Sequence, residues 1–287
     1  MIGFDHITNQ LDVIESAIEV EDRKSAFNQL RNLGLNDFVS VLWSLPDDRF
    51  PKLSRLLPSM APLETQKAWT GSSGALLLNQ TISFARSVAA NYASLTGGSL
   101  VDKTLLDFGC GYGRLLRAFS FFSDDLYGVD PWSESVRICH SSGLTENVYE
   151  SDYLPVSLPV PTHFDLVFSF SVFTHLSERA TRQCLLAIRR HMKDGGILCV
   201  TVRPVEYWRL VYRDASNEFL RRVEEQHRTH GFAFNPHHRD AVDGDVTYGD
   251  TSMTVDYLES VAEGFSFASM DRSGDDEMQR YVFLRAE

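Results

Sequence analysis

The residues with the clearest chemical potential lie in the stretch LLDFGCGYGRLLRAF, at positions 105–119. Gly109, Gly111 and Gly113 stand two residues apart, between an apolar run and an amphipathic helical pattern. A strand that turns into a helix through glycines lets a ligand approach the main chain, because no Cβ blocks it and positive φ is allowed. Loop N–H groups and the helix N-terminus then face that ligand. The pattern therefore predicts a ligand site.

Residues after the third glycine narrow the choice of ligand. A nucleoside-triphosphate loop ends in Gly-Lys-Ser or Gly-Lys-Thr, whereas Arg114 and Leu115 follow Gly113. A dinucleotide loop needs its third glycine at position 114, where helix and strand pack closely. Arg114 therefore disfavours a pyrophosphate site and an NAD-dependent oxidoreductase. An S-adenosylmethionine site and an ordinary tight turn without a ligand remain.

Two acids follow the next two apolar runs. Asp130 ends DLYGVD, 21 residues after Gly109, and its carboxylate can accept both hydroxyls of a ribose. Asp152 ends NVYESD and precedes Tyr153, a pair suited to an adenine amino group, while Pro131-Trp132 offers a flat apolar surface beside the same ring. Each acid could also be an ordinary helix or loop cap. Carboxyl ends of strands are where a doubly wound sheet opens its binding crevice.

Histidines supply the candidate proton acceptors. His175 follows the fourth apolar run in SVFTHL, and residues 226–253 contain four more histidines among many acids. An imidazole whose pKa lies near neutrality suits proton removal, and we take His175, His237 and His238 as the catalytic candidates. Asp243 and Asp245 offer hard oxygen ligands for Mg²⁺. No close-spaced metal signature accompanies them, so we expect no metal site.

The elements that must position these residues are short apolar strands alternating with helices. Strands are predicted at residues 103–109, 125–130, 147–152, 164–171 and 195–203. Continuous apolar strands alternating with helices are typical of a parallel sheet covered on both faces. Two closing strands, at 265–272 and 279–286, predict an antiparallel pair at the sheet edge.

The rest of the chain divides into an N-terminal region and an insertion. Residues 1–72 read as helices broken by prolines, with helical periodicity from Ile7 to Val20, and are expected to form a helical region or lid. Residues 73–287 are expected to form the α/β domain. Within it, the polar and aromatic segment 204–250 is interpreted as an insertion after the fifth strand that caps the substrate.

Composition limits the binding partners and the cellular location that we expect. The net charge of −12 argues against a sequence-independent grip on nucleic acid. Four cysteines lie far apart without a CxxC pair, which favours buried free thiols. No basic-then-apolar N-terminus and no apolar run of about 20 residues is present, so we expect a cytoplasmic protein with no signal peptide and no membrane partner.

Five motifs occur together in a fixed order. DFGCGYGR, GVD, ESDY, FDLVFSFSVFTHL and KDGGILCVTV, from Leu105 to Arg203, resemble the class I S-adenosylmethionine-dependent methyltransferases, and the tail from Thr254 resembles that family's closing helix and reversed strand pair. The resemblance implies a doubly wound, seven-stranded, mostly parallel sheet of order 3-2-1-4-5-7-6. It also implies S-adenosylmethionine as cofactor and S-adenosylhomocysteine as product.

The resemblance also assigns site residues. It implies that Gly109, Gly111 and Gly113 pass under the methionine portion of the cofactor and that Asp107 reaches its amino group through the loop or water. Cys110 belongs to the same cofactor-binding loop, as a bystander whose N–H is expected to be in use. Asp130 would hold the ribose. The remaining implied contacts are Asp152 and Tyr153 with Pro131 and Trp132 at the adenine, and Phe170 and Ser171 on the methionine side. Trp69 and Gly71, before the predicted helix at 73–96, either meet the cofactor carboxylate as part of a lid or form a simple turn with a Ser73 N-cap.

The expected reaction is transfer of a methyl group to a hydroxyl of a small molecule, such as a sugar, glycan or other hydroxylated metabolite. An in-line displacement depends on positioning, and a hydroxyl acceptor needs a base, here a histidine. FSFSVF stands where amide and base N-methyltransferases carry Asn/Asp-Pro-Pro-Tyr/Phe. Small-molecule N-methylation stays open as an alternative. So does a non-catalytic module that binds a partner, with the N-terminal helices as a homodimer surface.

Overall fold

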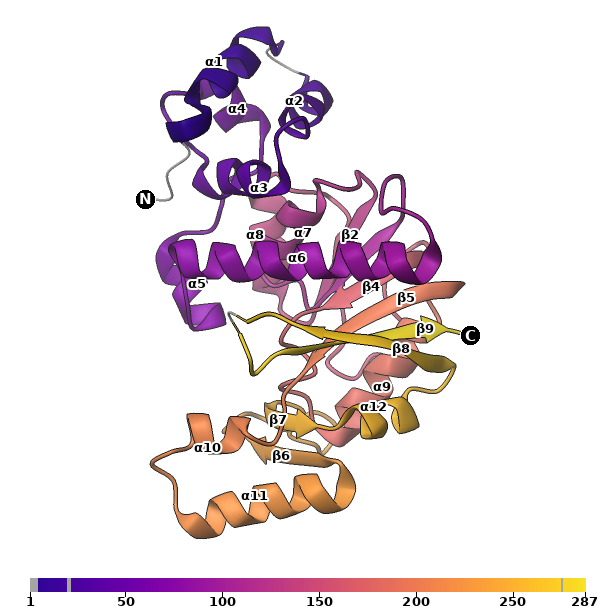
Figure 1. Cartoon of the computed structure of the whole chain (residues 1–287). Helices are drawn as coiled ribbons and strands as arrows, with labels where there is room; N and C mark the ends of the chain where they lie inside the picture. The colour runs from indigo at the N-terminus through magenta and orange to yellow at the C-terminus, as the bar shows by residue number, and fades with distance from the viewer. Residues whose placement is uncertain (1–4, 20–21, 275) are drawn as a thin grey trace.

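The computed structural model describes residues 5–19, 22–274 and 276–287. At its centre is a seven-stranded sheet of order β3-β2-β1-β4-β5-β9-β8 (Figure 1). Its strands are β1 (Leu105–Phe108), β2 (Leu126–Asp130), β3 (Val148–Glu150), β4 (Phe164–Ser169), β5 (Met192–Val202), β8 (Phe265–Arg272) and β9 (Arg280–Ala286). The first five pair in parallel, and β9 runs antiparallel between β5 and β8. The doubly wound sheet and its order are confirmed.

Alternate residues of each central strand enter different cores, because successive side chains of a strand point to opposite faces. Leu105 packs into the core that includes the N-terminal helices and α6 (Gly74–Thr96). Its neighbour Leu106 packs into a second core with α9 (Glu178–Arg189) and α12 (Val255–Val261). Both faces of the sheet are therefore buried, which explains the unbroken apolar runs in the sequence.

The first four α-helices of the chain form a lobe at one end of the molecule (Figure 1). The expected helix from Ile7 to Val20 is a 3-10 turn followed by a shorter α-helix, and Val20 itself lies outside the described residues. The elements of the lobe are η1 (Asp5–Ile7), α1 (Thr8–Ala17), α2 (Arg23–Leu30), α3 (Leu35–Ser44) and α4 (Pro51–Leu56). The next helix, α5 (Leu63–Thr70), lies outside the lobe, at the start of α6 (Figure 1). In the described ranges no helix is both long and apolar enough to cross a bilayer.

The insertion after β5 lies at the end of the molecule opposite to this lobe (Figure 1). It consists of α10 (Tyr207–Val211), α11 (Asn217–His230), β6 (Phe232–Pro236) and β7 (Gly249–Met253). Strands β6 and β7 form an antiparallel ribbon of their own, so the inserted structure extends to Met253. A bridge between Leu176 and Tyr248 joins it to the segment that follows β4.

Two short helices connect the first three strands of the sheet. They are α7 (Arg114–Phe119) and α8 (Ser133–Ser141). Gly113 is the N-cap of α7 with φ +75°, and a Cβ there would lie 2.5 Å from Cδ2 of Leu144. This glycine is therefore required by the packing of the loop against the segment after α8.

Candidate active site

A cavity of about 560 Å³ opens at the carboxyl ends of the parallel strands. Its floor includes Asp107, in β1, whose side chain is buried at 1% exposure. Neither carboxylate oxygen of Asp107 accepts a hydrogen bond from the described residues. Burial raises the pKa of Asp107 well above its ordinary value, although the charge of Arg114 opposes the rise. A buried carboxylate without a partner is costly, so this position suits a ligand group that donates hydrogen bonds or carries positive charge.

The glycine loop forms the adjoining wall. Gly109 and Gly111 line the cavity with φ of +78° and +52°. A Cβ on Gly109 would lie 2.3 Å from Cγ2 of Val172, so the loop is closely packed there. Cys110 also lines the cavity, but its N–H donates to the carbonyl of Val129 and is not available to a ligand. Gly113 does not line the cavity, so the structure does not place it under the methionine portion as expected. Its role is the packing against Leu144 described above.

Asp130, at the end of β2, fixes this loop. Its carboxylate accepts from the N–H of Gly111 at 2.9 Å, the N–H of Trp132 at 3.0 Å and the hydroxyl of Ser135 at 3.0 Å. Burial raises the pKa of Asp130, although these hydrogen bonds oppose the rise. Each carboxylate oxygen has more than one acceptor position, and Asp130 lines the cavity. It can therefore hold the loop and still accept from a ligand hydroxyl.

Aromatic and acidic residues surround one end of the cavity. Pro131, Trp132, Asp152 and Tyr153 line it, as the sequence predicts. Trp69 meets Trp132 edge to face, with ring centroids 5.5 Å apart. Pro131 and the two indole rings make this part of the lining apolar, and Asp152 adds a carboxylate, a combination that fits an adenosine.

The turn between α5 and α6 brings the N-terminal region to the cavity. Trp69 and Gly71 line it, and Gly71 ends α5 in a left-handed conformation. Ser73 precedes α6 in an extended conformation without a side-chain cap. The helices α1–α4 contribute no residue to the lining, so only this turn of the expected lid reaches the site.

On the other side, the segment after β4 carries the predicted pair Phe170 and Ser171, which line the cavity. Ser171 has φ +60°, a conformation that is rare for a non-glycine residue and that concentrates at functional sites. Its N–H donates to the hydroxyl of Thr201 at 2.7 Å, which holds it there. Gln279, from the turn between β8 and β9, donates to the Ser171 hydroxyl at 3.2 Å.

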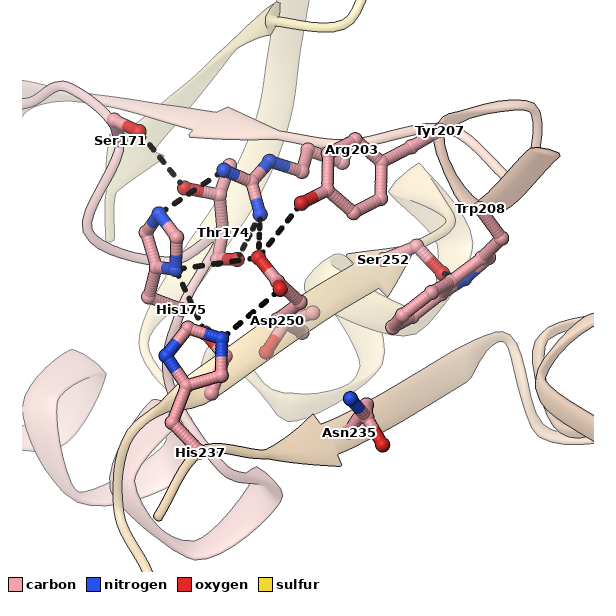
Figure 2. Close-up of polar contacts among 12 residues, drawn as sticks. Ser171, Thr174, His175, Arg203, Tyr207, Trp208, Asn235, His237, Asp250 and Ser252 are labelled. Atoms are coloured by element: carbon pink, nitrogen blue, oxygen red, sulfur yellow. Dashed lines mark hydrogen bonds and ion pairs between the residues drawn. The ribbon is translucent and has the colours of Figure 1, made fainter. Parts of the chain in front are cut away.

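A buried ionic network around Asp250 contributes Arg203, Tyr207 and Asp250 itself to the cavity lining (Figure 2). Asp250 accepts from Nη1 of Arg203 at 2.7 Å, the hydroxyls of Tyr207 at 2.7 Å and Tyr212 at 2.5 Å, and Nε2 of His237 at 3.0 Å. Burial alone would raise the pKa of Asp250, but these hydrogen bonds and the charge of Arg203 hold it well below its usual range. Asp250 is therefore an ionised carboxylate that orients four donors.

His175 lines the cavity, but both of its ring nitrogens are engaged (Figure 2). Nδ1 lies 2.6 Å from the carbonyl oxygen of Gly249 and therefore donates, while Nε2 lies 3.0 Å from Nη2 of Arg203 and therefore accepts. Burial, and then the charge of Arg203, lower the pKa of His175 to about 4. This arrangement does not fit the base role expected for His175. His175 is instead a neutral imidazole that accepts a hydrogen bond from Arg203 and helps to position it.

His237 and His238 differ in their surroundings. Nε2 of His237 must donate to the Asp250 carboxylate, so Nδ1 carries the lone pair, and among the described residues no hydrogen bond engages Nδ1. The His237 ring is 5.6 Å from the ring of Tyr248, which lines the cavity. Neither histidine lines the cavity, but His238 is exposed, whereas His237 is half-buried and bonded to the lining residue Asp250. Of the two, only His237 has the orientation of a base.

Several lining residues were not predicted from sequence as site residues. Arg203 ends the fifth predicted strand, and Gln80 and Asp276 form a hydrogen bond at 2.7 Å between α6 and the β8–β9 turn. Arg114 donates to the hydroxyl of Thr81 at 2.6 Å. Nothing in the local sequence marks these side chains, because each acquires its place through contacts with distant segments.

The candidate magnesium ligands lie away from this network. Asp245 accepts from the hydroxyl of Ser177 at 2.6 Å, and Asp243 is exposed. Across the ranges that the structure describes, no group of three or more His, Cys, Asp or Glu residues is arranged to hold a metal ion.

The central part of the chain matches a known protein family. Residues 106–200 match the family described as a methyltransferase domain. They span the strands from β1 into β5, with the glycine loop and both acids at the strand ends. Residues 106–200 thus form a methyltransferase domain, and the sheet order is the one implied by the resemblance to class I S-adenosylmethionine-dependent methyltransferases.

Individual relatives are distant. The tRNA U34 carboxymethyltransferase of Cellvibrio japonicus is 37% identical over 106 residues, which cover 35% of this chain and 32% of that protein. An uncharacterized methyltransferase of a Geobacillus species is 28% identical over 151 residues, covering 51% of this chain and 66% of that protein. The chain thus aligns with about a third to two thirds of the length of these methyltransferases.

Among solved structures, the PH0226 protein of Pyrococcus horikoshii matches with a TM-score of 0.52 and 12% identity. The match covers 77% of this chain and 98% of that chain. At this identity the match supports the fold alone, and the acceptor must be inferred from the site.

Proposed function

We propose that this protein is a methyltransferase that uses S-adenosylmethionine to methylate a hydroxyl group of a small molecule. The observation that carries the cofactor assignment is Asp107, a buried carboxylate at the floor of a glycine-walled cavity that accepts no hydrogen bond from any residue the structure describes. The ammonium of the methionine portion would supply the missing partner. Asp130 would accept from the ribose hydroxyls, and Trp132 with Asp152 would meet the adenine.

When bound, S-adenosylmethionine supplies a methyl group on a positively charged sulfur, ready for displacement by a lone pair. The protein must bring the acceptor oxygen into line and remove its proton. Phe170 and Ser171, held by Thr201 and Gln279, would form the wall beside the methionine portion. The cavity walls would also exclude water from the acceptor.

The proposed base is His237. Asp250 fixes the Nε2–H tautomer and leaves Nδ1 to take the proton of the acceptor hydroxyl. The same carboxylate stabilises the imidazolium that forms, the role of the acid in catalytic His–Asp pairs. Positioned proton transfer of this kind contributes roughly 10²- to 10⁴-fold to the rate.

The acceptor class rests on the cap and on charge. The insertion from α10 to β7 places Tyr207, Tyr248 and Asp250 at the cavity, which suits a small polar molecule. One relative carries tRNA in its name, but the net charge of −12 disfavours an RNA acceptor for this protein. A neutral amine already has a free lone pair and does not need His237 as a base. Methyl transfer to a hydroxyl should therefore depend on His237, whereas transfer to a neutral amine should not.

The test is incubation with methyl-¹³C-labelled S-adenosylmethionine and fractionated cell metabolites. The ¹³C chemical shift of the transferred methyl separates oxygen, nitrogen and carbon products. We expect an O-methyl signal in the small-molecule fraction that His237→Gln abolishes. An N-methyl product would overturn the hydroxyl assignment. Absence of both product and S-adenosylhomocysteine binding would favour the non-catalytic module.

A further inference from the structure

We propose that the acceptor carries an anionic group, a carboxylate or a phosphate, and that Arg239 binds it at the rim of the cavity. The proposal rests on the proposed function of the same site and names the substrate class more closely. Arg239 belongs to the cap, in the segment between β6 and β7, and it lines the cavity.

Two aromatic rings hold the Arg239 guanidinium in place. Its Cζ lies 4.1 Å from the ring centroid of Tyr248 and 5.2 Å from that of Trp132. Contact between guanidinium and ring limits side-chain freedom while leaving N–H groups at the edge of the fork. No hydrogen bond or ion pair engages Arg239 within the part of the chain that the structure describes. Its donors are therefore oriented and available.

The other two arginines of the cavity are committed elsewhere. Arg203 is paired with Asp250 and donates to the carbonyl of Thr174 and to His175. Arg114 donates to Thr81 and lies 4.8 Å from the Phe170 ring. Among the arginines of the lining, Arg239 alone has no hydrogen-bonded partner in the described ranges.

The positive charge of Arg239 stands out because the rest of the cavity is rich in acidic residues. Five aspartates line the cavity, namely Asp107, Asp130, Asp152, Asp250 and Asp276, and the whole chain carries −12. Such a field repels anions, so an anionic acceptor needs a dedicated cation. A guanidinium can bind a carboxylate or phosphate through two parallel hydrogen bonds.

The position of Arg239 connects the anion to the proposed chemistry. Tyr248, against which it packs, stacks on His175 at 4.9 Å and lies 5.6 Å from the ring of His237. An acceptor held by Arg239 would therefore extend toward the proposed base. Because Trp132 is also a proposed adenine contact, Arg239 would lie at the adenosine end of the cofactor and not beside its methionine carboxylate.

The experiment uses the full chain saturated with S-adenosylhomocysteine, titrated calorimetrically with benzoate, phenyl phosphate and benzyl alcohol. These probes share a phenyl ring and differ in charge. We expect one anion to bind, more weakly at high ionic strength, while benzyl alcohol gives no comparable heat. Preference for benzoate or for phenyl phosphate distinguishes a carboxylate from a phosphate. Arg239→Gln should weaken anion binding about tenfold or more, and Arg239→Lys by less.

Arg222→Gln is the matched control, because Arg222 is another exposed cap arginine that packs on a ring, 5.3 Å from the Phe219 centroid, but does not line the cavity. It should bind the anions as the wild type does. Equal anion binding by wild type and Arg239→Gln, or no anion binding by a protein that binds S-adenosylhomocysteine, overturns the proposal. Failure to bind S-adenosylhomocysteine at all would instead overturn the proposed function.

Discussion

Replacing Asp250 by Asn should destabilise the protein more than any other single acid-to-amide change in the cap. The substitution keeps the size of the side chain but removes the charge that four donors share. Arg203, only 8% exposed, would lose its counter-ion. Breaking a buried ion pair from one side costs about 3–5 kcal/mol, because the remaining charge stays buried.

The expected loss of unfolding free energy is about 3–4 kcal/mol. An unfolding entropy of about 2.1 cal/mol/K per residue converts this loss into a Tm decrease of about 5–7 °C for a chain of this length. The pH dependence follows from the lowered pKa of Asp250. Its stabilisation is fully present above the unfolded-state value near 4 and declines as the pH falls toward the folded-state value.

Urea and thermal unfolding of wild type and Asp250→Asn between pH 3 and 8 provide the assay. Asp243→Asn is the control, since its side chain is 76% exposed and should shift stability by less than about 0.5 kcal/mol. We expect a constant gap between wild type and Asp250→Asn above about pH 5, and a narrowing gap below about pH 4. A Tm equal to that of wild type, or a gap that widens in acid, would refute the reasoning.

Three further predictions follow. His237→Gln should lower turnover, measured by methyl transfer, by about 10²- to 10⁴-fold. It should not change the Kd for S-adenosylhomocysteine, measured by calorimetry, and His238→Gln should change neither quantity. An equal loss of turnover in the two variants would contradict the role of His237. Gly113→Ala should cost about 1–3 kcal/mol more than Gly97→Ala in urea unfolding, because both glycines have positive φ but only a Cβ at Gly113 meets Leu144 at 2.5 Å; equal costs would refute the packing argument. Because the pKa of His175 is lowered to about 4, its ring signals in an NMR titration should show no step between pH 5.5 and 8, and a step near 6.5 would contradict the hydrogen bonds assigned to it.

Strands and strand order were predictable from the sequence because buried parallel strands leave continuous apolar runs. The predicted run at 164–171 corresponds to β4, which ends at Ser169. The difference arises because Ser171 takes a left-handed conformation that no strand allows. The insertion was recognised by its polar composition. Its ribbon was not, because the alternation in residues 232–236 and 249–253 is too short to stand out.

The cofactor side of the candidate site was predictable because its signals are local: glycines after one strand and an acid after the next. The acceptor side was not, because its function depends on which atoms meet across the fold. Arg203 and His175 are 28 residues apart, and Asp250 is 47 residues from Arg203. Only these contacts show that both ring nitrogens of His175 are hydrogen-bonded, whereas His237 keeps on Nδ1 a lone pair that no described residue engages. Arg239 carries no sequence signal, since its partners Trp132 and Tyr248 lie on different segments.

The central claim is that Asp107 receives the ammonium of the cofactor at the floor of the glycine-walled cavity. The direct measurement compares calorimetric binding of S-adenosylhomocysteine and of 5′-methylthioadenosine, which lacks the amino-acid portion, to wild type and Asp107→Asn. We predict that Asp107→Asn weakens S-adenosylhomocysteine by about 10- to 100-fold and leaves 5′-methylthioadenosine unchanged. An equal effect on the two ligands, or no effect on either, would contradict the claim.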